Sequence, residues 1–425
     1  MSNIVEIKND LMGDSYFKIK HKTGLMIIVY PKPEYTSTYA VFGTKYGSID
    51  TSFKTSEQDK FTRIPEGTAH FLEHKLFESE DLDAFARYAK TGASANAYTS
   101  FDKTCYLFSC SDNFKESLEI LLDFVQHPYF TQQTVQKEQG IIGQEIKMYE
   151  DVPDWQVMFN LLKIMYHNHP VKIDIAGTVD SISQITAQVL YECYNTFYNL
   201  NNMVLAVVGK TTVEEVLQSA DRLLEQSEDV TVNREIQDEP QSIVNDYIEQ
   251  KLPVSMPQFN IGFKESYETP QRSLKEQIYT GILLEIIAGD ASSLYGDLFS
   301  KGLINTSFST EYFAGYGYAS VIFSGESRSP IDVKKLIEQE IEKLRKNGID
   351  EQDFQRARKM LYGRSIMEYN DIDSMANHFV SCHFEGYELF DELDIYKNVT
   401  LSDIEERFKH QLILNKCALS VILPN

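Results

Sequence analysis

The sequence is poor in cysteine, and its five cysteines follow no pattern. They are an odd number at irregular spacing, without a Cys-x-x-Cys pair: Cys105, Cys110, Cys193, Cys382 and Cys417. A disulfide framework or a structural zinc site built from cysteine is therefore not expected. Reduced thiols in a cytosol fit this usage best.

Long apolar runs are also missing. No stretch approaches the ~18 consecutive apolar residues of a membrane-spanning helix. Residues 1–10 have neither the basic segment nor the apolar segment of a secretion signal. We therefore expect a cytoplasmic protein that is neither exported nor embedded in a membrane.

Positive charge is scarce, with 40 Lys and Arg against 63 Asp and Glu and a net charge of −23. This balance argues against nucleic acid or an anionic membrane as a partner. It is compatible with a basic substrate, although the acidic surface of an ordinary cytosolic protein is the simpler explanation. Hydrophobic residues make up 42% of the 425 residues, which indicates a globular chain of two or three domains.

Among the features that are present, the segment 67–77 stands out because it contains His70-x-x-Glu73-His74. Residues four apart share one face of a helix, so both imidazoles can point at one ion. Imidazole suits zinc, and a catalytic zinc takes three protein ligands and leaves one position open. Glu73 would then be free to act on a water at that position, as in the inverzincin signature. The alternative is two histidines on a half-buried helix whose polar atoms are satisfied by backbone or water.

Two carboxylates on a predicted helix at 131–149 are candidates for the same site. Glu138 and Glu145 lie two helical turns apart and share a face. Taken alone, a solvated helix face is the more common explanation for such residues. The other cluster of metal-type residues, His167-Asn168-His169 before Pro170, is better explained as a polar turn.

Apolar periodicity outlines the remaining elements. Helical spacing predicts helices near 82–91, 113–126, 154–165, 181–198, 212–226, 273–287, 331–347, 351–369, 372–383 and 402–410. Alternation predicts a hairpin at 16–31 and strands near 36–46, 94–99, 104–109, 203–208, 259–263, 307–310, 318–324 and 418–423. Residues 52–64 are polar and predict a loop.

The chain contains an internal repeat. We predict a first repeat at 1–228, an acidic linker at 229–250, and a second repeat at 251–425. In the alignment of the repeats, Ile282 and Ile286 take the places of the two histidines, and Ala357 and Arg364 take those of the two helical carboxylates. The second repeat thus lacks every metal-type residue at once. Since its helices form without them, these residues are better explained by chemistry than by packing.

The sequence resembles a known family, the pitrilysin and mitochondrial-processing-peptidase family of zinc peptidases. The likeness rests on His70-x-x-Glu73-His74, on the later pair Glu138 and Glu145, and on two short runs, Asn96-Ala97-Tyr98-Thr99 and 177–182. It covers essentially the whole chain and is greatest for the short bacterial members with two repeats.

The resemblance implies an α+β fold with two homologous repeats, each a mainly antiparallel sheet packed on helices, which form one half-shell of a clamp around a chamber. It implies one Zn²⁺ per chain, held by His70, His74 and Glu145. Glu73 would be the general base, and Glu138 would orient a ligand histidine. The edge strand with Asn96, Ala97, Tyr98 and Thr99 would pair with an extended substrate.

The chain departs from the family in one respect. Active members also use an Arg and a Tyr that bind substrate and the tetrahedral oxyanion, but Leu298–Phe308 contains neither, and the next tyrosine is Tyr312. The resemblance therefore implies a zinc-dependent peptidase subunit that acts on peptides or flexible segments in a closed chamber. A homodimer or a heterodimer with a companion of similar fold would supply the Arg and Tyr. The alternative is a non-catalytic or half-site scaffold subunit of a processing-peptidase-like heterodimer.

Overall fold

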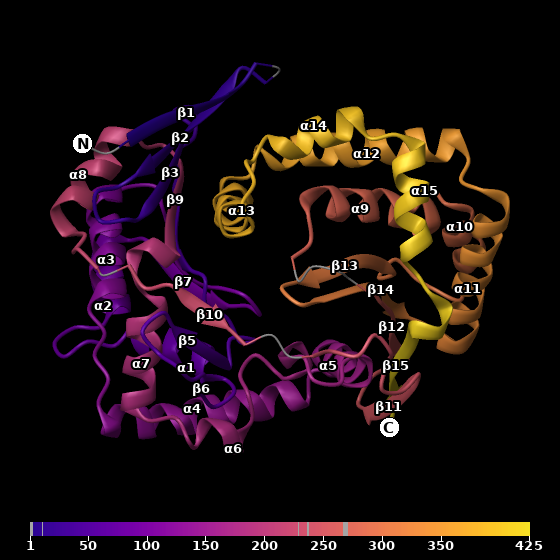
Figure 1. Cartoon of the computed structure of the whole chain (residues 1–425), viewed down its shortest axis with the longest axis horizontal. Coiled ribbons are helices and arrows are strands. Elements are labelled where there is room, and N and C mark those ends of the chain that lie inside the picture. Colours follow the sequence, from indigo (N-terminus) through magenta and orange to yellow (C-terminus); the bar gives the residue numbers. More distant parts are fainter. Residues whose placement is uncertain (1–2, 11, 228, 236–237, 267–270) are drawn as a thin grey trace. The chain divides into compact units, whose positions relative to one another are not determined.

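The computed structural model describes residues 3–10, 12–227, 229–235, 238–266 and 271–425. The chain divides into two compact units (Figure 1). The first unit comprises Met1–Ile146, Asp174–Glu235 and Met367–Phe390, and the second comprises Lys147–Ile173, Ile236–Ile366 and Asp391–Asn425. Neither unit is a continuous piece of the sequence.

The first unit is built on a seven-stranded sheet with the order β1-β2-β3-β9-β4-β8-β7. Its strands are β1 (Asn3–Asn9), β2 (Asp14–Lys20), β3 (Met26–Pro31), β4 (Thr38–Thr44), β7 (Ser94–Thr99), β8 (Thr104–Cys110) and β9 (Met203–Gly209). All neighbours are antiparallel except β3 and β9. Strand β7 lies at one edge, where β8 is its neighbour in the sheet.

Helices pack on this sheet and enclose an apolar core. They are α1 (Thr68–Leu76), α2 (Ala84–Thr91), α3 (Phe114–Gln126), α4 (Gln132–Glu150), α6 (Val179–Ile182), α7 (Ala187–Phe197), η2 (Leu200–Asn202), α8 (Val213–Leu223) and α13 (Ile372–Glu385). A small sheet with the order β10-β5-β6 completes the unit: β5 (Ser52–Thr55), β6 (Thr62–Arg63) and β10 (Val232–Arg234).

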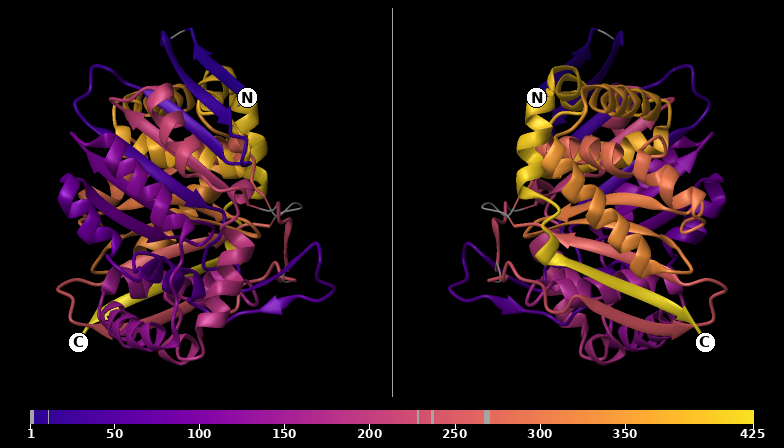
Figure 2. Two further views of the ribbon diagram at one scale, coloured as in Figure 1. Left: turned by 90° about the vertical axis from the view of Figure 1, so that its left-hand side faces the viewer. Right: turned by 90° about the vertical axis from the view of Figure 1, so that its right-hand side faces the viewer.

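The second unit repeats this plan with a five-stranded sheet of order β11-β15-β12-β14-β13. Its strands are β11 (Tyr247–Leu252), β12 (Gln258–Lys264), β13 (Ser309–Gly315), β14 (Tyr318–Glu326) and β15 (Cys417–Pro424), and Figure 2 shows β15 in yellow ending at the C-terminus. Only β11 and β15 are parallel, just as β3 and β9 are in the first sheet. The predicted α+β fold with two homologous sheet-and-helix repeats is confirmed.

The sequence analysis did not predict four helices of the second unit, which are η1, α10, α14 and η3. The full set is α5 (Pro153–Met165), η1 (Pro170–Lys172), α9 (Leu274–Ala288), α10 (Ser293–Ser300), α11 (Pro330–Asn347), α12 (Glu351–Glu368), α14 (Asp391–Asn398), α15 (Leu401–His410) and η3 (Leu414–Lys416). Among the described residues, no helix is both long and apolar enough to cross a bilayer.

The two repeats exchange one helix each. Helix α13 comes from the second repeat but belongs to the first unit, where it packs on β4 and β9; helix α5 comes from the first repeat and packs on β12 and β15 of the second unit. A glycine in an inner strand of each sheet, β4 or β12, permits each close approach. A Cβ on Gly43 would lie 2.9 Å from Val380, and one on Gly262 would lie 2.5 Å from Met165.

Three segments differ from the sequence predictions. Residues 52–64 are not simply a loop, because β5 pairs there with β6 and β10. The helix predicted at 181–198 is two helices, α6 and α7, because Thr186 caps a new helix after Ile185. Residues 229–250 contain β10 and the start of β11, each of which belongs to a sheet. The division of the chain into repeats at 228 and 250 stays a prediction.

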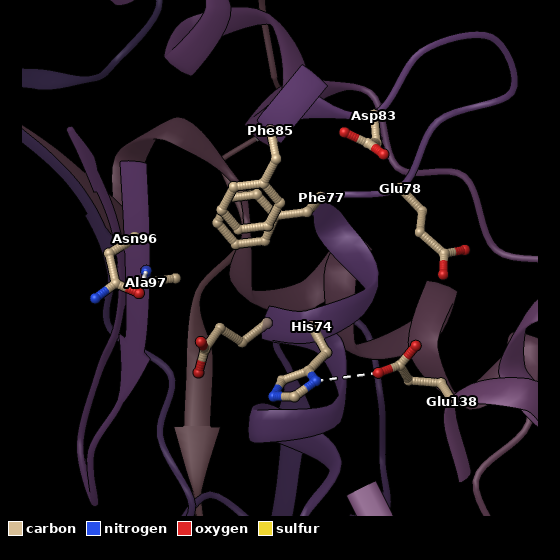
Figure 3. Close-up of a pocket in the computed structure, with 9 residues that line it drawn as sticks. His74, Phe77, Glu78, Asp83, Phe85, Asn96, Ala97 and Glu138 are labelled. Carbon is tan, nitrogen blue, oxygen red and sulfur yellow. Dashed lines mark hydrogen bonds and ion pairs between the residues drawn. The ribbon is translucent and has the colours of Figure 1, made fainter. Parts of the chain in front are cut away.

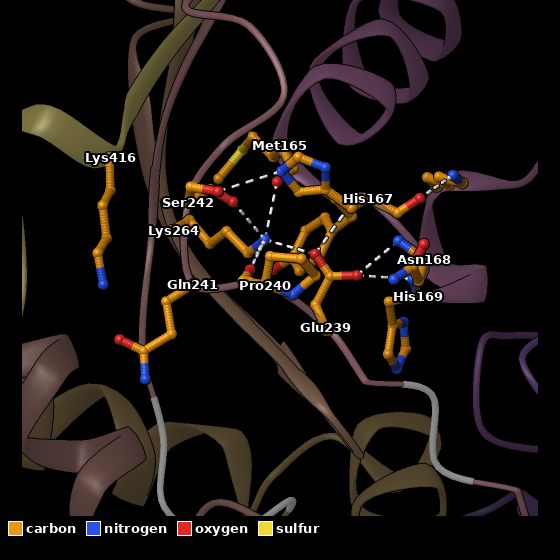
Figure 4. Close-up of polar contacts among 12 residues, drawn as sticks. Met165, His167, Asn168, His169, Glu239, Pro240, Gln241, Ser242, Lys264 and Lys416 are labelled. Carbon is orange, nitrogen blue, oxygen red and sulfur yellow. Dashed lines mark hydrogen bonds and ion pairs between the residues drawn. The ribbon is translucent and has the colours of Figure 1, made fainter.

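A buried ion pair in the second unit fixes part of the segment that the sequence predicts as a linker (Figure 4). The Lys264 ammonium donates to the Glu239 carboxylate at 2.5 Å and to the carbonyl oxygens of Met165, Pro240 and Ser242. Both side chains are almost fully buried, at 2% and 3% exposure. A buried charge pair with this many further hydrogen bonds holds its segment in one conformation.

The same carboxylate organises the His-x-His turn. The backbone N–H groups of His167, Asn168 and His169 all donate to Glu239. The His169 ring is buried, with Nε2 3.1 Å from the carbonyl oxygen of Tyr316 and Nδ1 accepting from the Val171 N–H. These contacts confirm the polar turn that the sequence favoured over a metal site.

Candidate metal centre

The position of helix α1 is set by a glycine at its start. Gly67 precedes the helix with φ of 83°, and a Cβ there would lie 2.3 Å from the carbonyl oxygen of Ala176. Only glycine accepts that conformation and that contact without strain. Phe71, Leu72 and Leu76 bury the other face of the helix in the core, so His70 and His74 share the remaining face, with ring centroids 4.6 Å apart.

Helix α4 brings Glu145 to the two imidazoles. His70 Nε2 lies 3.7 Å from Glu145 Oε1, and His74 Nε2 lies 3.5 Å from Glu145 Oε2. One ligand atom from each of the three residues can be chosen so that all lie within 4.8 Å of one another. The structure thus brings together three ligand-type side chains that the sequence placed on two separate helices.

The three side chains fit a zinc ion. Ligands at 2.0–2.1 Å in a tetrahedron are separated by about 3.3 Å, which is close to the distances between the nitrogens and the carboxylate here. Two neutral imidazoles and one carboxylate are also a common catalytic zinc donor set. Glu138 Oε1 accepts from His74 Nδ1 at 3.0 Å, which leaves the lone pair on Nε2, the nitrogen that lies 3.5 Å from Glu145 Oε2. In the described part of the chain, His70 Nδ1 is buried without a hydrogen-bond partner.

The electrostatics of the site favour a cation. Burial, together with the charge on His74, lowers the pKa of His70 to about 3, so its ring is neutral as a metal ligand must be. Burial alone would lower the pKa of His74, but the hydrogen bond to Glu138 and the charges of Glu73 and Glu145 outweigh it and raise that pKa. The same carboxylates that favour a proton on His74 favour a metal ion beside it.

Glu73 is buried on α1 between the two histidines and is 8% exposed. Burial raises its pKa, and the hydrogen bond from the Thr99 hydroxyl to Oε2, at 2.6 Å, lowers it and partly offsets that rise. A carboxylate with a raised pKa accepts and returns a proton near neutral pH more readily than an exposed one. The contact with Thr99 was not predicted from the sequence.

The edge strand β7 and helix α1 border a cavity of about 350 Å³ (Figure 3). Asn96 and Ala97 line it on the strand side, and the stacked rings of Phe77 and Phe85 close it at 4.3 Å between centroids. Glu73, His74, Glu78, Asp83 and Glu138 also line it. The sequence analysis did not identify Phe77, Glu78, Asp83 or Phe85, because no spacing rule links the end of α1 and the start of α2 to a strand edge.

The remaining predicted strand residues have other contacts. The Tyr98 hydroxyl donates to Asn377 Oδ1 of α13 at 2.8 Å. The Asn96 side chain accepts from the N–H of Ala97 at 2.9 Å. Thus Asn96 and Ala97 face the cavity, Thr99 contacts Glu73, and Tyr98 joins the strand to α13.

Comparison with known proteins gives two family matches. Residues 62–179, which contain all the predicted site residues, match the family described as "Insulinase (Peptidase family M16)". Residues 184–361 match the "Peptidase M16 inactive domain".

Curated relatives match at full or partial length. The chain is 38% identical to "Uncharacterized zinc protease YmfH" of Bacillus subtilis (strain 168), over 99% of both chains. It is 26% identical to "Probable mitochondrial-processing peptidase subunit beta, mitochondrial" of Arabidopsis thaliana, over 73% of this chain and 61% of that protein.

Solved structures share the fold. A putative M16-like peptidase from Alicyclobacillus acidocaldarius has a TM-score of 0.92 at 33% identity, over 100% of this chain and 99% of that one. A protease from Helicobacter pylori has a TM-score of 0.82 at 18% identity over the full length of both, which is a likeness of fold alone.

Proposed function

Because this chain belongs to peptidase family M16, we propose that it is a zinc-dependent peptidase subunit that hydrolyses peptide bonds in peptides or flexible polypeptide segments. The observation that carries the proposal is the convergence of His70, His74 and Glu145, with Glu73 buried beside them. We assign one zinc ion per chain to the first three residues.

The zinc ion would supply Lewis-acid chemistry that activates a water and polarises the scissile carbonyl. Glu73 takes a proton from the attacking water and passes it to the leaving amine. Glu138 holds the His74 ring through Nδ1 and so keeps Nε2 available as a ligand atom.

The substrate would bind as an extra strand. Strand β7 is at the edge of its sheet, next to α1, and an extended peptide can pair with such an edge through main-chain hydrogen bonds. One side chain of the peptide would enter the cavity beside Asn96 and Ala97. A chamber closed by a partner would restrict access to peptides and flexible segments.

We further propose a companion subunit of similar fold, in a homodimer or a heterodimer. Leu298–Phe308 lacks the Arg and Tyr that stabilise an oxyanion in the family, and the enclosing region 184–361 matches a domain described as inactive. The same departure favours the second candidate, a scaffold or half-site subunit. A scaffold has no need for His70, Glu73, His74, Glu138 and Glu145 together, which is why we prefer the peptidase.

A cytoplasmic location remains part of the proposal. Cys105, Cys110, Cys193 and Cys417 are buried free thiols, as a reducing compartment allows.

The Glu73→Gln variant tests the proposal. It should retain zinc, because Glu73 is not a ligand, and should lose turnover by about a thousandfold, because the amide cannot accept the proton. The measurement is zinc content by mass spectrometry and cleavage of a quenched peptide library, with and without a co-purified companion. Glu80→Gln, on the exposed loop after α1, is the control and should cleave normally. Unchanged cleavage by Glu73→Gln would contradict the role of Glu73 as the general base.

A further inference from the structure

The last residue of β7 contacts the proposed base. Thr99 Oγ1 lies 2.6 Å from Glu73 Oε2, the short distance of a hydroxyl bonded to a carboxylate. A carboxylate can only accept, so the Thr99 proton lies on this bond. The neighbouring hydroxyl of Thr104 donates to the carbonyl oxygen of Tyr46 at 2.9 Å and is 3.4 Å from Thr99 Oγ1. The Thr99 hydroxyl therefore donates to Glu73, and the Thr104 hydroxyl donates to Tyr46.

The backbone around Thr99 is held in place. Thr99 is paired with Thr104 in the β7–β8 ladder. The next residue, Ser100, is held by two backbone hydrogen bonds: its carbonyl oxygen accepts from the N–H of Ser48, and its N–H donates to the carbonyl oxygen of Lys103. Threonine is branched at Cβ, so few rotamers are open to it in a strand. A fixed strand and a stiff side chain make the hydroxyl a fixed donor.

The Glu73 carboxylate needs such a donor. The terminal torsion of a glutamate is broad, so burial alone does not set the plane of its two oxygens. With Oε2 bonded to Thr99, rotation of the carboxylate is restricted and Oε1 is left for the proton that moves between water and the leaving amine.

The second repeat shows that the strand does not require this hydroxyl for its fold. Its edge strand β13 ends in Phe313-Ala314-Gly315, three residues without a hydroxyl group. The strand still pairs with β14 along its whole length. In the repeat alignment, the facing helix has Ile282 and Ile286 in place of the histidines. The hydroxyl therefore occurs in the repeat that has the metal-type residues.

We propose that Thr99 is a positioning residue that fixes the Glu73 carboxylate, so that the strand offered to the substrate also orients the base. This rests on the proposed peptidase function. It assigns to Thr99 a role in the proton transfer, in place of the contact with substrate that the family resemblance implied.

Two variants separate this role from a structural one. Thr99→Val has nearly the same shape without the hydroxyl, and Thr99→Ser keeps the hydroxyl. With the companion present, Thr99→Val should lower kcat by about 10–100-fold with KM within about threefold, because a hydrogen bond to a charged group is lost. Thr99→Ser should restore kcat to within about threefold of the wild type. Zinc per chain and the melting temperature should not change.

A second readout does not depend on turnover. The zinc-loaded chain is titrated with a peptide hydroxamate, a probe that binds zinc and shares its proton with the base. Thr99→Val should weaken its binding by about fivefold or more, and Thr99→Ser by less than about twofold.

The outcomes are distinct. If the wild type cleaves peptides and Thr99→Val matches it in kcat and in hydroxamate affinity, the positioning role is overturned and the peptidase stands. Equal losses in Thr99→Val and Thr99→Ser would also overturn it, since the hydroxyl would then not matter. A wild-type chain that binds no zinc overturns the proposed function and this inference with it.

Discussion

At the scale of single residues, the charge balance of the site determines what it binds. Three carboxylates, Glu73, Glu138 and Glu145, surround two imidazoles, one of which is neutral because its pKa is about 3. Negative charge in excess and a neutral nitrogen donor are what a metal cation requires. Helical spacing made the two histidines a candidate pair, and the family resemblance added Glu145 and Glu138 to the predicted set. The Thr99 contact was not predictable, because nothing in the sequence relates the end of a strand to a helix 26 residues earlier.

Glu138 provides a prediction at this scale. Glu138→Gln keeps the size of the side chain but weakens the acceptor for His74 Nδ1 and makes the tautomer of that ring less defined. We expect zinc affinity to fall by about 10–100-fold. Competition with a chromogenic chelator measures this. Glu150→Gln, at the exposed end of the same helix, is the control. Equal zinc affinity in Glu138→Gln and the wild type would contradict the orienting role.

At the scale of elements, local signals were sufficient for most helices. Thr212 and Glu215 form a capping box at the start of α8, and Gly92 ends α2 with φ of 76°. The short strands β10 and β11 were missed because their partners, β5 and β15, are far away in the sequence. The exchange of α5 and α13 could not be predicted, since each helix has the same amphipathic pattern whichever sheet it covers.

The turn that follows α5 gives a pH prediction. Burial lowers the pKa of His169 to about 4, against 6.5 in an unfolded chain. Between these values the unfolded chain binds the proton first, so the contribution to stability is complete above about pH 6.5 and is lost as the pH falls towards 4. It amounts to at most about 3 kcal/mol.

Urea unfolding of the second unit between pH 4.5 and 7 tests this. His169→Gln should show a flatter dependence of the unfolding midpoint on pH than the wild type, because the titrating group is gone. His410→Gln, at a side chain that is 71% exposed, should leave the slope unchanged. A wild-type slope in His169→Gln would show that other groups cause the acid sensitivity.

At the scale of the whole molecule, the two repeats have corresponding sheets but different residues at the positions of the candidate metal ligands. The five strands of the second sheet follow the order of β3-β9-β4-β8-β7 in the first, and each sheet has a single parallel pair. The metal cluster among the described residues nevertheless belongs to the first unit. The alignment of the repeats made this asymmetry visible in the sequence, since isoleucine, alanine and arginine replace the ligand-type residues together. The compact units themselves were not predictable, because each takes in a helix from the other repeat.

The zinc content of the purified full-length chain tests the central claim most directly. After zinc loading and dialysis, plasma mass spectrometry should find one zinc per wild-type chain and one per Glu150→Gln chain. Glu145→Gln removes the only carboxylate of the ligand set, so it should retain far less than one. A wild-type chain without zinc, or a Glu145→Gln chain that retains as much as the wild type, would contradict the proposed metal centre.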